Sequence, residues 1–288
     1  MTKAVIRALS LIVTALLLFP PALHAAPPEN ETLVLGVFPY LSANQMMEQL
    51  SPLSKRIEET LGKKVTMVSA PDFLSFVDRI TRGEYDLVLT AAHMGRLAQT
   101  RDGWKRVARS GQKTAAVLLV RKDSGIHGLQ DLRGKKMAVG NVRSVTYLLA
   151  EEVLVQNGLT AGKDVKIIET TTFSNVVQSV FLREADVGAT PTLLWDNWVN
   201  VNEAQNRELR EIYRTKQTIP SFLIMAGPRT DRATIRRLRE SLLSFKNTPE
   251  GRSFFEKSRY DSFLPLGEAT MKQIDPYVHV LLERKAEK

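Results

Sequence analysis

Residues 137–150, MAVGNVRSVTYLLA, carry the clearest pattern for binding chemistry in this chain. They predict a short apolar strand, a turn containing Gly140, and a helix that begins near Ser144. Free N–H groups at a helix start, together with the positive end of the helix dipole, favour a bound anion. Ser144 and Thr146 add hydroxyl groups, and Arg143 adds a charge. We therefore expect an anion site here; the alternative is a Ser144 that only caps its own helix.

Polar side chains also follow other predicted strands. Tyr40 comes after one strand, Thr90 and His93 after another, and Thr190 after a third. In open α/β sheets, ligands bind beyond the carboxyl ends of the strands. We expect these loops to share one cleft with the Ser144 helix start. The alternative for each is a turn that satisfies only its own backbone, and for His93 a satisfied histidine at a helix start.

Patterns typical of enzymes and metal sites are scarce. The histidines form no pair at metal-ligand spacing, no acidic cluster has the spacing of a calcium loop, and the common nucleotide and nucleophile motifs are absent. We predict no catalytic residue, no metal and no cofactor, and a binding protein rather than an enzyme. An exported enzyme that uses His93 as its acid or base stays open as an alternative.

Strands and helices alternate along the chain. The predicted strands of the first block cover residues 33–37, 65–68 and 85–89, and those of the second cover 137–139, 165–168 and 185–189. Amphipathic helices separate them. This alternation predicts an α/β fold in two blocks, each an open sheet flanked by helices.

The N-terminus and the composition indicate an exported protein. Lys3 and Arg7 precede an apolar run and a small-residue segment, which predicts a cleavable signal peptide over residues 1–25. The chain has no cysteine, so a sizeable core rather than disulfides must hold the fold. Its net charge is +9, or +7 without Lys3 and Arg7, and this excess suits an anionic ligand or an anionic surface. No aromatic-rich basic patch appears, and we expect no nucleic-acid partner.

Several segments resemble a known family, the phosphate, phosphite and phosphonate substrate-binding proteins that serve ABC transporters in the periplasm. Residues 140–146 lie where that family has a GDPxSTS phosphonate loop. The other similar segments are APDF at 70–73, YDLV at 85–88, VRKDSG at 120–125, LQDLRGK at 129–135 and TPEGR at 248–252.

The resemblance implies a type II periplasmic-binding fold of two α/β lobes. Lobe one would take residues 30–117 and 222–288, and lobe two residues 118–221. Hinge strands at about 114–120 and 219–225 would join them. Closure of the lobes would trap a small anion and present a surface to a membrane permease. We expect a periplasmic monomer; the alternative is an orphan sensor or accessory protein of the same fold, acting on a membrane-bound receptor.

The departures from the family pattern concern the ligand. The Ser-Thr-Ser run becomes Ser144-Val145-Thr146, so one hydroxyl is lost. Phe73 and Thr90 stand where the family has phenols, Phe173-Ser174 near its pocket histidine, and Thr190 near its amine-binding acid. None of these substitutes can hold an ammonium group. We therefore expect phosphate, phosphite, an alkylphosphonate or a sulfonate rather than an aminoalkylphosphonate.

Overall fold

The computed structural model describes residues 32–40, 42–201, 207–278 and 282. The predicted signal peptide, residues 1–25, lies outside these residues. The chain separates into two units after Glu31, and everything described below belongs to the second unit. Within the described ranges, no helix has both the length and the apolar composition needed to cross a membrane.

The first sheet has six strands and is parallel on one side. Its order is β2 (Val65–Val68), β1 (Leu33–Val37), β3 (Leu87–Ala91), β12 (Phe222–Ala226), β4 (Lys105–Ser110) and β13 (Phe263–Leu264). Strand β1 pairs in parallel with both neighbours, so that Leu35 lies opposite Met67 and Leu87. Strand β12 comes from much later in the chain and runs antiparallel to β3 and β4.

The second sheet repeats this plan with five strands. Its order is β8 (Lys166–Glu169), β7 (Lys136–Val139), β9 (Val187–Pro191), β6 (Ala116–Arg121) and β10 (Leu209–Arg214). Strand β7 pairs in parallel with β8 and β9, whereas β6 is antiparallel to β9 and β10. In both sheets the first strand of the block therefore lies between the second and the third, and a helix lies between these successive strands along the chain.

The two segments predicted as paired hinge strands lie side by side only briefly. Strand β5 (Lys113–Thr114) pairs with β11 (Ile219–Pro220) in a ladder of two residue pairs. Beyond it, β6 completes the five-stranded sheet and β12 completes the six-stranded sheet. Residues 219–225 therefore do not pair with residues 114–120 along their whole length. Most of each segment pairs with other strands, as β6 in the five-stranded sheet and as β12 in the six-stranded sheet. The exact lobe bounds stay a prediction.

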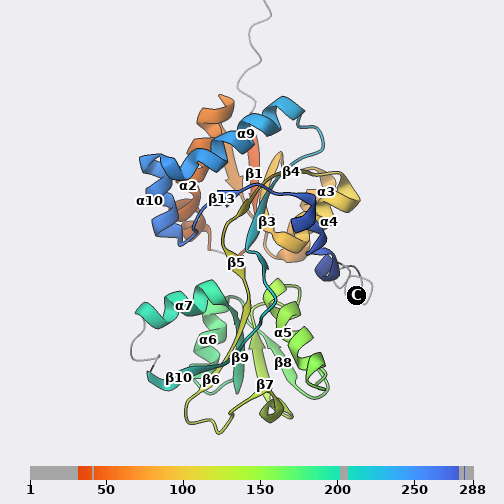
Figure 1. Ribbon diagram of the computed structural model, residues 1–288, viewed down its shortest axis with the longest axis vertical. Helices are drawn as coiled ribbons and strands as arrows, with labels where there is room; N and C mark the ends of the chain where they lie inside the picture. Colours follow the sequence, from red (N-terminus) through yellow and green to blue (C-terminus); the bar gives the residue numbers. More distant parts are fainter. Residues whose placement is uncertain (1–31, 41, 202–206, 279–281, 283–288) are drawn as a thin grey trace, which may run out of the picture. The chain divides into compact units, whose positions relative to one another are not determined.

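Helices follow most of the parallel strands (Figure 1). They are α2 (Ala43–Leu61), α3 (Phe73–Arg82), α4 (Ala92–Asp102), α5 (Val145–Gln156), α6 (Phe173–Phe181), α7 (Thr192–Val201), α9 (Arg232–Ser244), α10 (Pro249–Ser258) and α11 (Glu268–Lys272), with short 3-10 helices η1 (Leu129–Leu132) and η2 (Phe245–Asn247). Polar caps set several starts: Ser42 accepts from Gln45 N–H before α2, and Asp72 from Ser75 N–H before α3.

Strand β6 shows how the core is built. All its residues except Arg121 are buried, and they alternate between two clusters. Val117 and Leu119 pack with residues of α6, such as Val176, while Leu118 belongs to the larger cluster that includes α5 residues. A strand covered on both faces has no solvent side, which explains its continuous apolar sequence.

Candidate functional site

The predicted site residues lie at the carboxyl ends of the parallel strands. Helix α4 begins directly after β3, α5 begins one turn after β7, and α7 follows β9. The chain thus brings several helix starts to the edges of the two sheets, where open α/β sheets bind ligands.

A hydrogen bond links the loop before α5 to the start of α4. The Nε2 atom of His93, the second residue of α4, lies 2.8 Å from the backbone oxygen of Arg143. Arg143 immediately precedes Ser144, the N-cap of α5. His93 is fully buried, and burial lowers the pKa of its imidazole to about 4. The ring is therefore neutral at pH 7, although the backbone oxygen of Arg143 partly offsets this effect.

Helix α5 starts as the sequence predicts, and its cap uses the serine hydroxyl. Ser144 Oγ accepts from Tyr147 N–H at 3.2 Å and donates to the backbone oxygen of Asn141 at 2.7 Å. Asn141 Oδ1 also accepts from Arg143 N–H at 2.8 Å. Ser144 therefore caps its own helix, as the alternative interpretation predicted. Its hydroxyl proton is used, and only one lone pair of Oγ remains for a ligand.

The next two residues complete the first turn of α5. Val145 and Thr146 are both buried, at 8% and 3% exposure. In the described part of the chain, the Thr146 hydroxyl makes no hydrogen bond within the protein. Thr146 is therefore the hydroxyl of this loop that is most available to an added anion.

Helix α4, in contrast, begins without a side-chain cap. Ala91 precedes it and supplies no acceptor for the first-turn N–H groups. Ala92, His93 and Met94 are all at most 1% exposed. Buried helix starts normally find acceptors, since an unmet donor away from water costs free energy. The start of α4 therefore lacks the side-chain acceptor that Ser144 supplies to α5.

Thr90 and Thr190 occupy corresponding positions in β3 and β9. Both are fully buried. Thr90 lies beneath α4, because a Cβ atom added at Gly95 would lie 3.0 Å from the Thr90 methyl group. The Thr90 hydroxyl is 3.5 Å from the Ala91 backbone oxygen. The Thr190 hydroxyl has no partner in the described structure. Of the two hydroxyls, that of Thr190 is therefore the one available to a ligand.

Tyr40 belongs to an aromatic cluster that the sequence did not reveal in full. Its ring stacks on Phe38 at 4.4 Å between centroids, and its hydroxyl lies 2.5 Å from the hydroxyl of Tyr260. Phe222 packs edge-on against Tyr260, and Phe73 packs against Phe38. Burial raises the pKa of both phenols, so both stay protonated. Tyr260 and Phe222 lie about 180 residues or more along the chain from Tyr40, and no local pattern could associate them with it.

The aromatic cluster adjoins the start of α4. Phe222 lies opposite Ala91 in the antiparallel β3–β12 ladder, two residues before His93. The backbone N–H of Phe38 donates to the Leu89 oxygen at 3.0 Å. The fold therefore places an apolar wall beside the uncapped helix start.

Phe173 covers the turn before α5. A Cβ atom at Gly140 would lie 2.7 Å from its ring, so only glycine fits beneath it. The neighbouring Ser174 is exposed on the first turn of α6. The side chain of Arg143 is half-buried, and its Nε has no hydrogen-bond partner among the described residues. A cation with an unmet donor beside this loop favours an anionic ligand.

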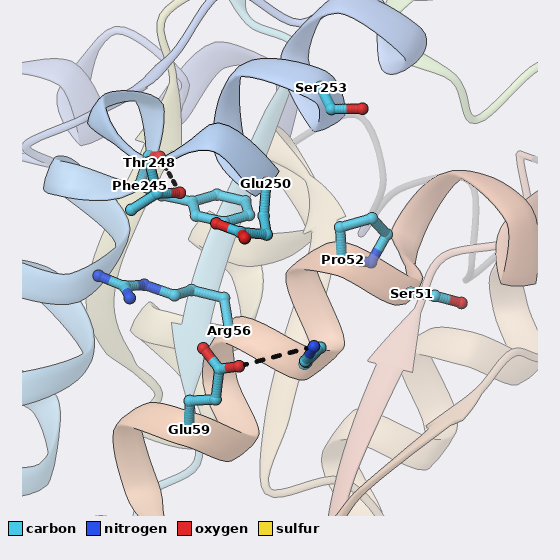
Figure 2. Close-up of a pocket in the computed structure, with 9 residues that line it drawn as sticks. Ser51, Pro52, Arg56, Glu59, Phe245, Thr248, Glu250 and Ser253 are labelled. Atoms are coloured by element: carbon cyan, nitrogen blue, oxygen red, sulfur yellow. Dashed lines mark hydrogen bonds and ion pairs between the residues drawn. The ribbon is translucent and has the colours of Figure 1, made fainter.

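A separate cavity of about 350 Å³ lies between α2, η2 and α10 (Figure 2). The Arg56 guanidinium lies 5.9 Å from the centroid of the Phe245 ring, and Lys55 pairs with Glu59 at 4.0 Å. Glu250 supplies a second carboxylate to the lining. Two cations and two anions leave no excess positive charge, and we do not assign the anion to this cavity. No group of three metal-ligating side chains occurs in the residues that the structure describes.

Comparisons with known proteins agree with the topology. A curated relative, the phosphonates-binding periplasmic protein of Escherichia coli strain K12, is 23% identical over 249 residues, which cover 83% of this chain and 73% of that protein. The structure of PhnD1 from Prochlorococcus marinus in complex with methylphosphonate is similar with a TM-score of 0.77, at 16% identity, over 88% of this chain and 99% of that one. XAC2383 from Xanthomonas citri bound to chloride ion matches with a TM-score of 0.73, at 25% identity, over 88% and 99%.

These likenesses confirm the predicted fold class, a mixed α/β type II periplasmic-binding fold. The profile of a protein family, described as ABC transporter, phosphonate, periplasmic substrate-binding protein, matches residues 35–270. Since that match spans most of the sequence, the chain belongs to the family of periplasmic substrate-binding proteins of phosphonate ABC transporters.

Proposed function

We propose that this protein is exported to the periplasm and captures a small oxyanion in a cleft between its two lobes for an ABC importer. The candidate ligands are phosphate, phosphite, an alkylphosphonate and a sulfonate. Residues 1–25 would direct export, and a membrane permease would receive the ligand.

The start of α4 carries this proposal. Its first-turn N–H groups are buried and have no side-chain cap, and the neighbouring loop brings Arg143 with an unpartnered Nε. Backbone donors and a helix dipole favour an anion, and Arg143, whose backbone oxygen contacts His93, would add a positive charge. Thr146 and Thr190 add hydroxyls that the fold leaves without partners in the described structure.

The wall of the site favours a ligand without an ammonium group. Phe73, Phe173, Thr90 and Thr190 carry no charge, and Tyr40 is a protonated phenol. An ammonium group placed here would lose its water and find no carboxylate among these five side chains, which costs several kcal/mol. PhnD1 is bound to methylphosphonate, a small oxyanion without an amine, and this supports the proposal.

The proposed lobes, residues 30–117 with 222–288 and residues 118–221, fit a closing mechanism. Between β4 and β6 and between β10 and β12 the chain passes from one sheet to the other, and the short β5–β11 ladder lies on these two passages. So short a ladder offers little resistance to bending. Closure would exclude water from the anion and strengthen its hydrogen bonds.

Calorimetry on the mature chain tests the proposal. Phosphate, phosphite, methylphosphonate and methanesulfonate would be titrated into wild type and into Arg143→Ala. We expect at least one anion to bind, and Arg143→Ala to weaken it by about tenfold or more, the equivalent of about 1.5 kcal/mol for a lost charged hydrogen bond.

Arg237→Ala is the matched control, because Arg237 is an exposed arginine on α9. It should change the affinity little. Failure of all four anions to bind would refute the oxyanion assignment. Equal losses of affinity in the two variants would show that only the net charge of the protein affects binding. An unchanged affinity in Arg143→Ala would show that Arg143 does not contact the anion.

A further inference from the structure

His93 presents an unprotonated ring nitrogen at the start of α4. Its Nε2 lies 2.8 Å from the Arg143 backbone oxygen, and a carbonyl oxygen can only accept a hydrogen bond. Nε2 must therefore carry the proton. In a neutral imidazole the other nitrogen, Nδ1, is then an acceptor with a free lone pair. Burial keeps the ring neutral, since it lowers the pKa to about 4.

This acceptor is buried and has no partner. His93 is 0% exposed, and within the described structure nothing donates to its Nδ1. Nδ1 is bonded to Cγ, so it stays beside the first turn of its own helix. The bond from Nε2 links the ring to the backbone oxygen of Arg143, the residue before the Ser144 cap. His93 is the second residue of α4, so the free lone pair belongs to a side chain of the same uncapped helix start that offers backbone donors to an anion.

An acceptor placed among donors discriminates between anions. An oxyanion oxygen without a proton would turn its lone pair toward that of Nδ1, and the two would repel. An oxygen that carries a proton would donate to Nδ1, while the remaining oxygens accept from the helix start and from Arg143. The site therefore suits a tetrahedral anion with both kinds of oxygen.

We propose that Nδ1 of His93 accepts a hydrogen bond from an O–H group of the bound oxyanion, so that the protein selects oxyanions that carry a proton over anions of the same shape that lack one. This inference rests on the proposed oxyanion function and makes it more specific. Alkyl hydrogen-phosphonates and hydrogen phosphate would be accepted, whereas alkylsulfonates and sulfate would be rejected.

Two pairs of ligands test this proposal by calorimetry in mildly acidic buffer. Methylphosphonate and methanesulfonate have nearly the same shape, and only the first carries an O–H; phosphate and sulfate form the second pair. We expect the wild type to prefer the protonated member of each pair by about tenfold to a hundredfold. Equal affinity for the two members would overturn the proposal and leave the oxyanion function intact. Binding of none of the four would overturn both.

Variants of His93 assign the preference to Nδ1. In His93→Phe a ring of similar shape remains, but both nitrogens are lost, so no acceptor remains at the position of Nδ1. We expect its preference within each pair to fall at least tenfold. His127→Gln, at an exposed histidine, is the control and should keep the full preference. A His93→Phe protein that binds as wild type does would overturn the assignment.

Nitrogen-15 NMR of wild-type protein covers the case in which His93→Phe does not fold. The spectrum should show the His93 proton on Nε2, and the Nδ1 resonance should move when methylphosphonate is added but not when methanesulfonate is added. The proposal would be overturned if the proton were on Nδ1. It would also be overturned if the Nδ1 chemical shift did not change at saturating methylphosphonate.

Discussion

Replacement of Thr190 by valine should stabilise the protein and weaken its ligand binding at the same time. The Thr190 side chain is 0% exposed, and its hydroxyl has no partner in the described structure. A buried hydroxyl without a hydrogen bond costs about 1–3 kcal/mol. Valine has nearly the same shape, so it fits the same space beside Val117, the residue opposite in β6.

The magnitude follows from these numbers. Removal of the unmet hydroxyl should raise the free energy of unfolding by about 1–2 kcal/mol, which corresponds to roughly 2–6 °C in the melting temperature of a chain of this size. If Thr190 keeps its hydroxyl for the anion, the same change should weaken anion binding by about tenfold, the equivalent of about 1.4 kcal/mol.

Thermal unfolding monitored by circular dichroism, followed by calorimetric titration with the anion that binds best, measures both effects. Thr90→Val is the matched control, because Thr90 has the corresponding position in β3 and its hydroxyl is 3.5 Å from the Ala91 oxygen. It should raise stability less than Thr190→Val does. A Thr190→Val protein that melts earlier and binds equally well would refute the reasoning, since its hydroxyl would then have a structural partner.

Three further changes test other parts of the site. Tyr260→Phe should cost about 1–3 kcal/mol in urea unfolding, because it leaves the Tyr40 hydroxyl without its partner at 2.5 Å; no loss would mean that water replaces the bond. Ser144→Ala should cost about 1 kcal/mol in the same assay, because it removes the cap of α5; an unchanged stability would contradict the cap. From pH 7 to pH 5 the unfolded chain takes up a proton on His93 that the folded chain, with a pKa of about 4, does not bind. The unfolded state then binds more protons, so the free energy of unfolding should fall by about 2 kcal/mol between pH 7 and pH 5. If His93→Gln loses the same amount of stability over this range, another titrating group is responsible for the loss.

The sequence predicted the strands and the caps because these depend on neighbours along the chain. Ser144, for example, precedes an apolar helical pattern and caps the helix expected after it. The apolar run that became β6 was recognisable from its composition. The pattern could not predict how many residues of this segment pair with residues 219–225. A strand buried on both faces can pair equally well with several neighbouring strands.

The candidate site shows the same division. From sequence, Ser144 and its helix start were the centre of the anion site, because a strand followed by a turn and a helix is visible locally. The structure gives the Ser144 hydroxyl to its own cap and leaves the start of α4 without one. The bond between His93 and the Arg143 backbone oxygen joins residues 50 positions apart. No periodicity reports such a contact.

The sequence by itself therefore determined the α/β class, the helix starts and a family resemblance, all of which are encoded in short runs of residues. Only the tertiary structure decided the strand order, the aromatic wall in which Tyr260 meets Tyr40, and the nitrogen of His93 that remains free. The physical reason is that burial and unmet hydrogen bonds are properties of groups brought together from distant parts of the chain. Donors and acceptors can be counted as satisfied or free only after every partner has been placed.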